Sequence, residues 1–161
     1  MPVMNIHTDP ESLTLTMTAE FDATEEQVWE LWADPRKLER WWGPPAAPST
    51  FERHELEPGG TVTYFMTSPE GERFYGLWRV VAVDPPRSLD VEDSFADADG
   101  NVNPDMPTGQ MHMRLTEEDG RTRMELISVN ETKEAMQQLL DMGAAEGMQQ
   151  AIGQMDALLA E

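Results

Sequence analysis

The sequence has 161 residues, no cysteine, and 31 acidic against 11 basic residues, which gives a formal net charge of -20 at pH 7. This length suits one domain spanning residues 1–161 with a single core, and the lack of cysteine excludes disulfides and thiolate metal sites and is typical of a reducing compartment. An acidic surface repels phosphate backbones and anionic lipids, and no apolar run is long enough to span a bilayer, so we expect a cytoplasmic protein without nucleic-acid or membrane partners.

The first predicted element is a strand. Residues 1–12 are expected to form an N-terminal extension, after which apolar and polar residues alternate from Leu13 to Phe21. Alternation with a period of two is typical of a strand that buries one face.

Two short helices are predicted next. Thr24 and Gln27 match a capping box, in which the two side chains satisfy free N–H groups at a helix start. Asp34 followed by Pro35 predicts the start of a second helix. This helix must end near Trp42, because a glycine and two prolines follow.

A run of strands then extends to Asn130. The sequence predicts six of them, at residues 51–56, 61–68, 74–84, 88–95, 110–118 and 122–130. Proline and glycine residues that are typical of turns separate them: Pro69, Gly71, Pro85, Pro86 and Gly120. Antiparallel strands joined in this way form a meander, to which the first strand adds a seventh.

The last predicted element is one long amphipathic helix over residues 132–160, with a bend near Gly143. At 1.5 Å per residue it would be roughly 43 Å long, enough to cross a whole curved sheet. Its inner face combines glycine and alanine with flexible methionines. Small residues there either leave space for a cavity or permit close packing against the sheet, with methionine filling gaps.

Four motifs together cover nearly the whole chain. They are FDATEEQVWELWADPRKLERWWGP at Phe21–Pro44, EPGG at Glu57–Gly60, VVAVDPPRSL at Val80–Leu89 and EGMQQAIGQMDALL at Glu146–Leu159. In this combination the chain resembles the START-like (SRPBCC, helix-grip) superfamily, and specifically its Hsp90 ATPase activator homologue branch.

This resemblance implies an α+β helix-grip fold, in which a curved seven-stranded antiparallel sheet wraps around the long C-terminal helix and two short helices lie between strands 1 and 2. It also implies a deep apolar cavity between sheet and helix that opens near the loops and the short helices. Many relatives have tryptophan where this chain has Met148, which should widen that part of the interior.

The candidates for lining this cavity are large apolar side chains that alternation or helical spacing places inward. They are Trp32, Trp42, Tyr64, Met66, Trp78, Met111, Met113, Met148, Ile152 and Met155. Each of them also fits a role as core filler. We expect Trp41 and Trp42 to divide these tasks, so that one fills the core and the other lines the entrance.

No metal or cofactor site is predicted. His7, His54 and His112 lack the spacing of zinc ligands. The loop at residues 97–105 resembles a calcium loop, but its glycine is the fourth residue instead of the sixth and no glutamate occupies the twelfth position. This long loop could instead act as a lid over the cavity.

Three functions fit the sequence. The favoured one is binding of a small hydrophobic or amphipathic molecule, without catalysis. The second is a cyclase-type or hydrolase-type enzyme on the same scaffold, using polar groups such as Tyr64, Asp93, Arg79 or His54. The third is a chaperone-related module whose acidic face binds a protein partner. A homodimer also stays open.

Overall fold

The computed structural model describes residues 3–161 of the chain. Within them the strands are β1 (Val3–Asp9), β2 (Thr14–Phe21), β3 (Ser49–His54), β4 (Thr61–Thr67), β5 (Arg73–Asp84), β6 (Ser88–Ala96), β7 (Thr108–Glu118) and β8 (Arg121–Asn130). The helices are α1 (Glu25–Ala33), α2 (Pro35–Leu38), α3 (Lys133–Asp141), α4 (Ala144–Gly153) and α5 (Met155–Leu159).

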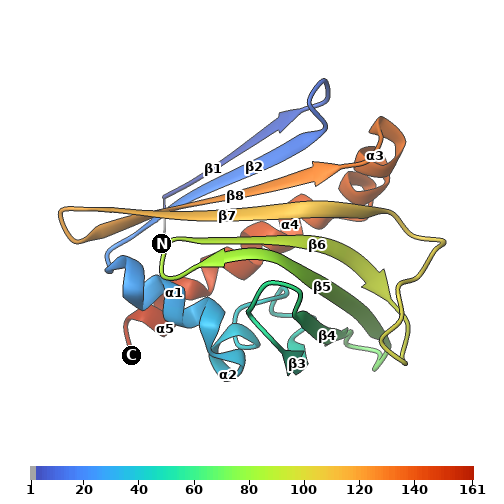
Figure 1. Ribbon diagram of the computed structural model, residues 1–161, viewed down its shortest axis with the longest axis horizontal. Coiled ribbons are helices and arrows are strands. Elements are labelled where there is room, and N and C mark those ends of the chain that lie inside the picture. Colours follow the sequence, from blue (N-terminus) through green and yellow to red (C-terminus); the bar gives the residue numbers. More distant parts are fainter. Residues whose placement is uncertain (1–2) are drawn as a thin grey trace.

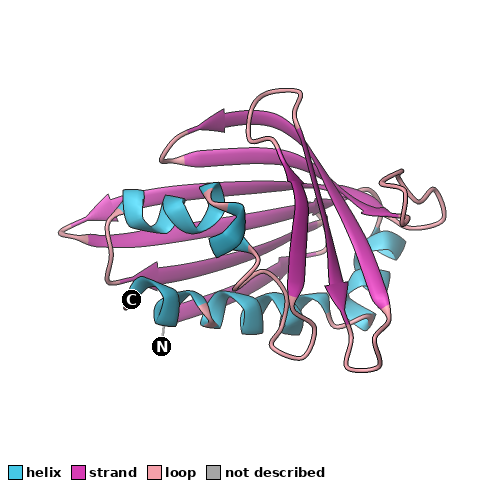
Figure 2. Ribbon diagram, turned by 90° about the horizontal axis from the view of Figure 1, so that it is seen from below, coloured by secondary structure: helices cyan, strands magenta, loops and turns pink. Residues whose placement is uncertain are grey.

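All eight strands belong to one antiparallel sheet, in the order β1-β2-β8-β7-β6-β5-β4-β3. Figure 1 shows this sheet from its outer side, with the C-terminal helices behind it. In Figure 2 the sheet curves, and all the helices lie on one side of it. The predicted α+β class and the curved antiparallel sheet are therefore confirmed.

The predicted strand count of seven is wrong, because the structure has an eighth strand. β1 lies within the predicted extension and pairs with β2 along its whole length, from Val3 opposite Glu20 to Asp9 opposite Thr14. The Asp9 carboxylate accepts the backbone N–H of Glu11 in the connecting turn. The residues of β1 do not alternate clearly between apolar and polar, so pairing with β2 determines this strand.

The predicted capping signals hold α1 and α2. The Gln27 backbone N–H donates to the Thr24 hydroxyl oxygen at 3.2 Å, and the Thr24 backbone N–H donates to the Gln27 side chain at 2.8 Å. At the start of α2 the Arg36 backbone N–H donates to the Asp34 carboxylate at 2.9 Å. The chain then turns at Gly43, which has a φ of 102°, and leaves for β3.

The C-terminal region is not one continuous helix. The predicted bend near Gly143 is present, since this residue has a left-handed φ of 84° and separates α3 from α4. A second interruption at Gln154 separates α4 from α5. The three segments together still cross the inner face of the sheet, as Figure 2 shows.

A cluster of aromatic side chains fills the half of the inner face that lies beside α1 and α2. Trp32 contacts Trp41 edge to face with ring centroids 4.9 Å apart, and Trp42 contacts Trp78 in the same way at 4.8 Å. The Trp41 indole N–H donates to the Leu31 carbonyl oxygen at 2.9 Å. This cluster fills one end of the space enclosed by the curved sheet. At the other end the sheet faces α3 and α4.

Candidate functional site

A cavity of about 370 Å³ lies between the sheet and the helices α3 and α4. Its apolar lining on the sheet side includes Leu15, Met17, Met66, Phe95 and Leu126. The helices contribute Met136, Leu139, Leu140, Met148 and Ala151. Phe74 on β5 and Met142 at the end of α3 also border the cavity, and both are more than half exposed to solvent. The cavity therefore opens to the outside between the start of β5 and the α3–α4 junction.

Small residues on the helix side leave this space unfilled. Gly143, Ala144, Gly147 and Ala151 all line the cavity. A Cβ atom built on Gly147 would have no heavy atom within 4 Å. Close packing against the sheet, the alternative interpretation of these small residues, does not occur at Gly147.

Tyr64 on β4 places a hydroxyl on the cavity wall. Its ring lies over Gly76 of the neighbouring strand, and a Cβ atom at position 76 would be 2.3 Å from the ring. On its other side the ring stacks on Phe51 with centroids 4.9 Å apart. Burial, together with the nearby Asp93 carboxylate, raises the pKa of Tyr64 well above its usual range. The hydroxyl therefore stays protonated.

Asp93 on β6 is the other titratable group deep in the wall. It is paired in register with Trp78 on one side and Gly109 on the other, and its side chain lines the cavity. The carboxyl forms no hydrogen bond or ion pair with any residue in the range 3–161. Burial raises the pKa of Asp93 to about 7. The Asp93 side chain is partly accessible to solvent where it borders the cavity, and protein atoms surround its other sides.

The neighbouring indole groups add unused hydrogen-bond donors. The Nε1–H groups of Trp42 and Trp78 lie near the Tyr64 hydroxyl and offset part of the rise in its pKa. Neither of them, nor that of Trp32, has a hydrogen-bond partner of normal geometry in the described chain. Buried polar groups are nearly always satisfied in folded proteins, so three buried indole donors without partners are unusual.

The structure brings four of the predicted lining residues together at the cavity: Trp42, Tyr64, Met66 and Met148. The other six do not line it and are packed in the core: Trp32, Trp78, Met111, Met113, Ile152 and Met155. The reason is that the aromatic cluster fills the space between the sheet and the helices at its end of the molecule, so inward-facing residues there contact other side chains. Trp41 is sealed in this core and Trp42 borders the cavity, which answers how the two tryptophans differ.

The polar residues named for an enzyme do not form one site. Tyr64 and Asp93 both line the cavity. Arg79 is exposed, and it does not line the cavity. The His54 Nε2–H donates to the Trp32 carbonyl oxygen at 3.1 Å, next to α1, and burial lowers the pKa of this histidine. Of these four groups, the Asp93 carboxyl and the Tyr64 phenol are therefore the two available to a bound molecule.

The sequence suggests Asp93 as a polar group of a possible enzyme, but Asp93 is not among the residues predicted to line the ligand cavity. A signal was present, because Asp93 continues the inward register of Leu89 and Val91 on the same strand. A carboxyl at an inward position is ordinarily assigned to the surface. The sequence places small residues on the inner face of the C-terminal helix, but only the three-dimensional surroundings of Gly143 and Gly147 show that they border open space.

The loop at residues 97–105 has the structure of a turn. The Asp97 carboxylate accepts the backbone N–H groups of Asp99 and Asn101, at 2.9 and 3.0 Å. Within the described residues, no three or more histidine or acidic side chains are grouped as they would be around a metal ion. The segment that follows this loop reaches the cavity, which Pro107 lines.

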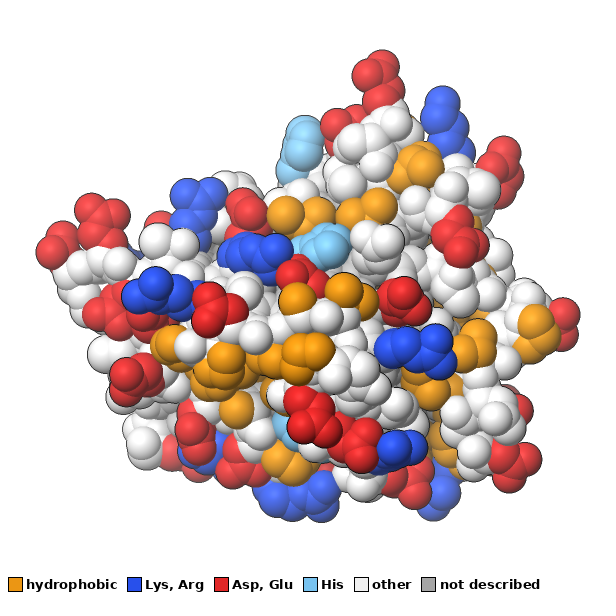
Figure 3. Space-filling view, viewed as in Figure 1, with side chains coloured by type: hydrophobic (Ala, Val, Ile, Leu, Met, Phe, Trp, Pro, Cys, Tyr) orange, Lys and Arg blue, Asp and Glu red, His pale blue; other side chains and the backbone are white. Residues whose placement is uncertain are grey.

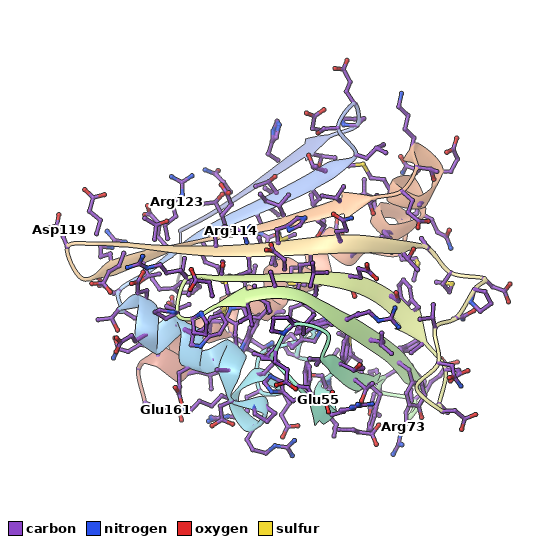
Figure 4. All side chains as sticks on the ribbon, in the orientation of Figure 1. Glu55, Arg73, Arg114, Asp119, Arg123 and Glu161 are labelled. Atoms are coloured by element: carbon purple, nitrogen blue, oxygen red, sulfur yellow. The ribbon has the colours of Figure 1, made fainter. Side chains whose placement is uncertain are left out.

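Charged side chains other than Asp93 lie outside the cavity. Figure 4 shows Arg114 and Arg123 on the sheet and Glu161 at the C-terminal end, and none of these lines the cavity. On the face seen in Figure 3, acidic side chains are scattered among basic and apolar ones instead of forming a block. No helix among residues 3–161 is long and apolar enough to cross a membrane.

Known proteins share this fold and much of this sequence. The chain is similar to protein Ms6760 from Mycobacterium smegmatis, at 48% identity and a TM-score of 0.91 over 99% of this chain and 97% of that one. A protein from Arthrobacter aurescens is 42% identical, with a TM-score of 0.92 over 97% of this chain and 91% of its own. The AHSA1 protein from Silicibacter pomeroyi, at 22% identity and a TM-score of 0.72 over 91% of this chain and 97% of that one, shows a likeness of fold alone.

No protein with curated annotation matches the chain. The family model described as Activator of Hsp90 ATPase homolog 1-like protein matches residues 22–160, which is most of the sequence. The chain therefore belongs to the family of Activator of Hsp90 ATPase homolog 1-like proteins.

Proposed function

We propose that this protein binds a small hydrophobic or amphipathic molecule in the cavity between the sheet and the helices α3 and α4. The observation that carries the proposal is the cavity itself, about 370 Å³ in volume and lined mainly by apolar side chains. Small-molecule sites in proteins are typically about 300 to 1,000 Å³, with mostly apolar walls and a few polar groups. Tyr64 and Asp93 are such polar groups here.

The shape of the site supports the same conclusion. Apolar side chains exposed at the mouth, such as Phe74 and Met142, offer an entry path for a molecule that avoids water. Gly147 keeps the helix side of the cavity open. A protein stabilised only by packing would gain free energy by filling this space, since unfilled core volume is destabilising.

The test is a titration with N-phenyl-1-naphthylamine, a neutral apolar dye whose fluorescence rises in apolar surroundings. We expect saturable binding of one dye per chain. Gly147→Leu should weaken it at least tenfold, because the new side chain enters the cavity. The matched control is Gly153→Leu, on the same helix but outside the cavity lining, which should leave affinity within twofold. Equal affinities in the two variants would refute binding at this site.

Native mass spectrometry of gently purified protein would then identify the natural ligand class. We expect an adduct of a few hundred daltons above the sequence mass, absent from Gly147→Leu. An adduct that persists in this variant would belong to another site.

A further inference from the structure

Binding of a purely apolar ligand does not explain the carboxyl of Asp93 on the cavity wall. Placing an ionisable carboxyl among apolar side chains without a partner is unfavourable, so buried charges are normally paired. Asp93 forms neither a hydrogen bond nor an ion pair with any residue between 3 and 161. The cavity is the side from which a partner can reach it.

Among residues 3–161, the surroundings of Asp93 supply no positive charge. The titratable groups of these residues that line the cavity are Asp93 and the phenols of Tyr64 and Tyr75, and they include no lysine, arginine or histidine. The helices opposite present only apolar or small residues, such as Met136, Leu140 and Gly147. An ionised Asp93 therefore makes this cavity a negatively charged spot in apolar walls, and burial favours its neutral form until a partner arrives.

We propose that the ligand is an amphipathic amine, whose protonated nitrogen pairs with the Asp93 carboxylate while its apolar body lies against α3 and α4. This inference rests on the proposed function and adds the chemical class of the ligand. The complementary partner for an unpaired carboxylate is a cation, and a charge-assisted hydrogen bond is about twice as strong as a neutral one. The Tyr64 hydroxyl, near Asp93, is a second polar group within the same wall.

The same arrangement disfavours fatty acids and other apolar anions. A carboxylate head group in this cavity would meet Asp93 at close range with no cation among the lining residues to offset the repulsion. The overall charge of -20 also repels an anionic ligand as it approaches the protein.

Three probes with the same ten-carbon chain separate these cases: decylamine, decanol and decanoate. Each is used below its aggregation limit to displace N-phenyl-1-naphthylamine at pH 8, where the amine is protonated and Asp93 is ionised. We expect decylamine to bind at least tenfold more tightly than decanol, and decanoate to bind more weakly than decanol.

Two variants assign this preference to the carboxyl. Asp93→Asn keeps the shape of the side chain and removes its charge, so it should lower decylamine affinity at least tenfold and leave decanol within threefold. Unchanged decanol binding also shows that the variant is folded with an intact cavity. Glu92→Gln is the matched control. Glu92 is the neighbouring residue on β6 and is exposed, so this substitution removes the same charge from the surface. It should leave the preference for the amine unchanged.

The outcomes distinguish this inference from the proposed function. Binding of all three probes with equal affinity, or an amine preference that survives in Asp93→Asn, would overturn the inference and leave the apolar site standing. An amine preference lost equally in Glu92→Gln would assign it to general surface charge and also overturn the inference. Failure of the dye and of every probe to bind would overturn both.

Discussion

The side chain of Asp93 makes the stability of this protein depend on pH. Its pKa is raised by burial to about 7 in the folded state, from an ordinary value of 3.8. The folded protein therefore holds this proton more tightly than the unfolded chain does. As the pH rises from 3.8 to about 7, the contribution of Asp93 to the free energy of unfolding falls. The loss is up to about 4 kcal/mol.

We expect Asp93→Asn to remove this loss. Relative to the parent protein, its melting temperature should be higher at pH 8 and similar at pH 4.5, which thermal unfolding by circular dichroism would measure. Carboxyls whose pKa is lowered, such as Asp90 beside Arg114, change stability with pH in the opposite direction. Both proteins contain them, so their contribution cancels when the melting temperatures of the two proteins are subtracted. An Asn variant that is less stable than the parent at pH 8 would show that the carboxyl has a stabilising partner.

A second prediction concerns the contact between Tyr64 and Gly76. Because a Cβ atom at position 76 would lie 2.3 Å from the tyrosine ring, Gly76→Ala should lower the free energy of unfolding by about 1 to 3 kcal/mol, the usual effect of overpacking a core. Urea denaturation would measure it. In a Tyr64→Leu background, Gly76→Ala should lower the free energy of unfolding much less. An equal loss in both backgrounds would mean that the strand backbone, not the ring, is the cause.

Among the helices, two glycines four residues apart should respond in opposite ways to the same substitution. Gly143 has a φ of 84° at the junction of α3 and α4, so Gly143→Ala should lower the free energy of unfolding by about 1 to 2 kcal/mol. Gly147 lies within α4 and faces open space, so Gly147→Ala should raise it by up to about 1 kcal/mol. Urea denaturation of both variants tests this, and losses of equal size would show that the junction is not strained.

Most elements were predictable because they depend on local signals. Thr24 and Gln27 fix the start of α1 through hydrogen bonds between residues close in sequence. Strand β1 was not predictable, since it is held by pairing with β2 and its residues from Asn5 to Thr8 are exposed. The break at Gln154 follows Gly153, a weak helix former, but apolar residues keep their helical spacing on both sides of it, so the sequence predicts a continuous helix there.

At the scale of the whole molecule, the fold was recognisable and the site was only partly so. Motifs spread along the chain indicated the helix-grip architecture, which the family match over residues 22–160 bears out. Which inward-facing residues border a cavity depends on how the aromatic cluster fills one end of the grip. Trp32 and Met113 face inward, yet other side chains cover them completely. Alternation along a strand cannot separate these two environments.

The different positions of Trp41 and Trp42 give the protein a built-in optical probe. Trp41 is enclosed in the core and hydrogen-bonded to Leu31, while Trp42, the next residue, borders the cavity. The emission of an indole shifts with the polarity around it. Entry of a molecule into the cavity should change the surroundings of Trp42, whose ring lies 5.5 Å from that of Trp41. The summed tryptophan emission of the cluster should therefore shift with occupancy, so that binding can be followed without a label.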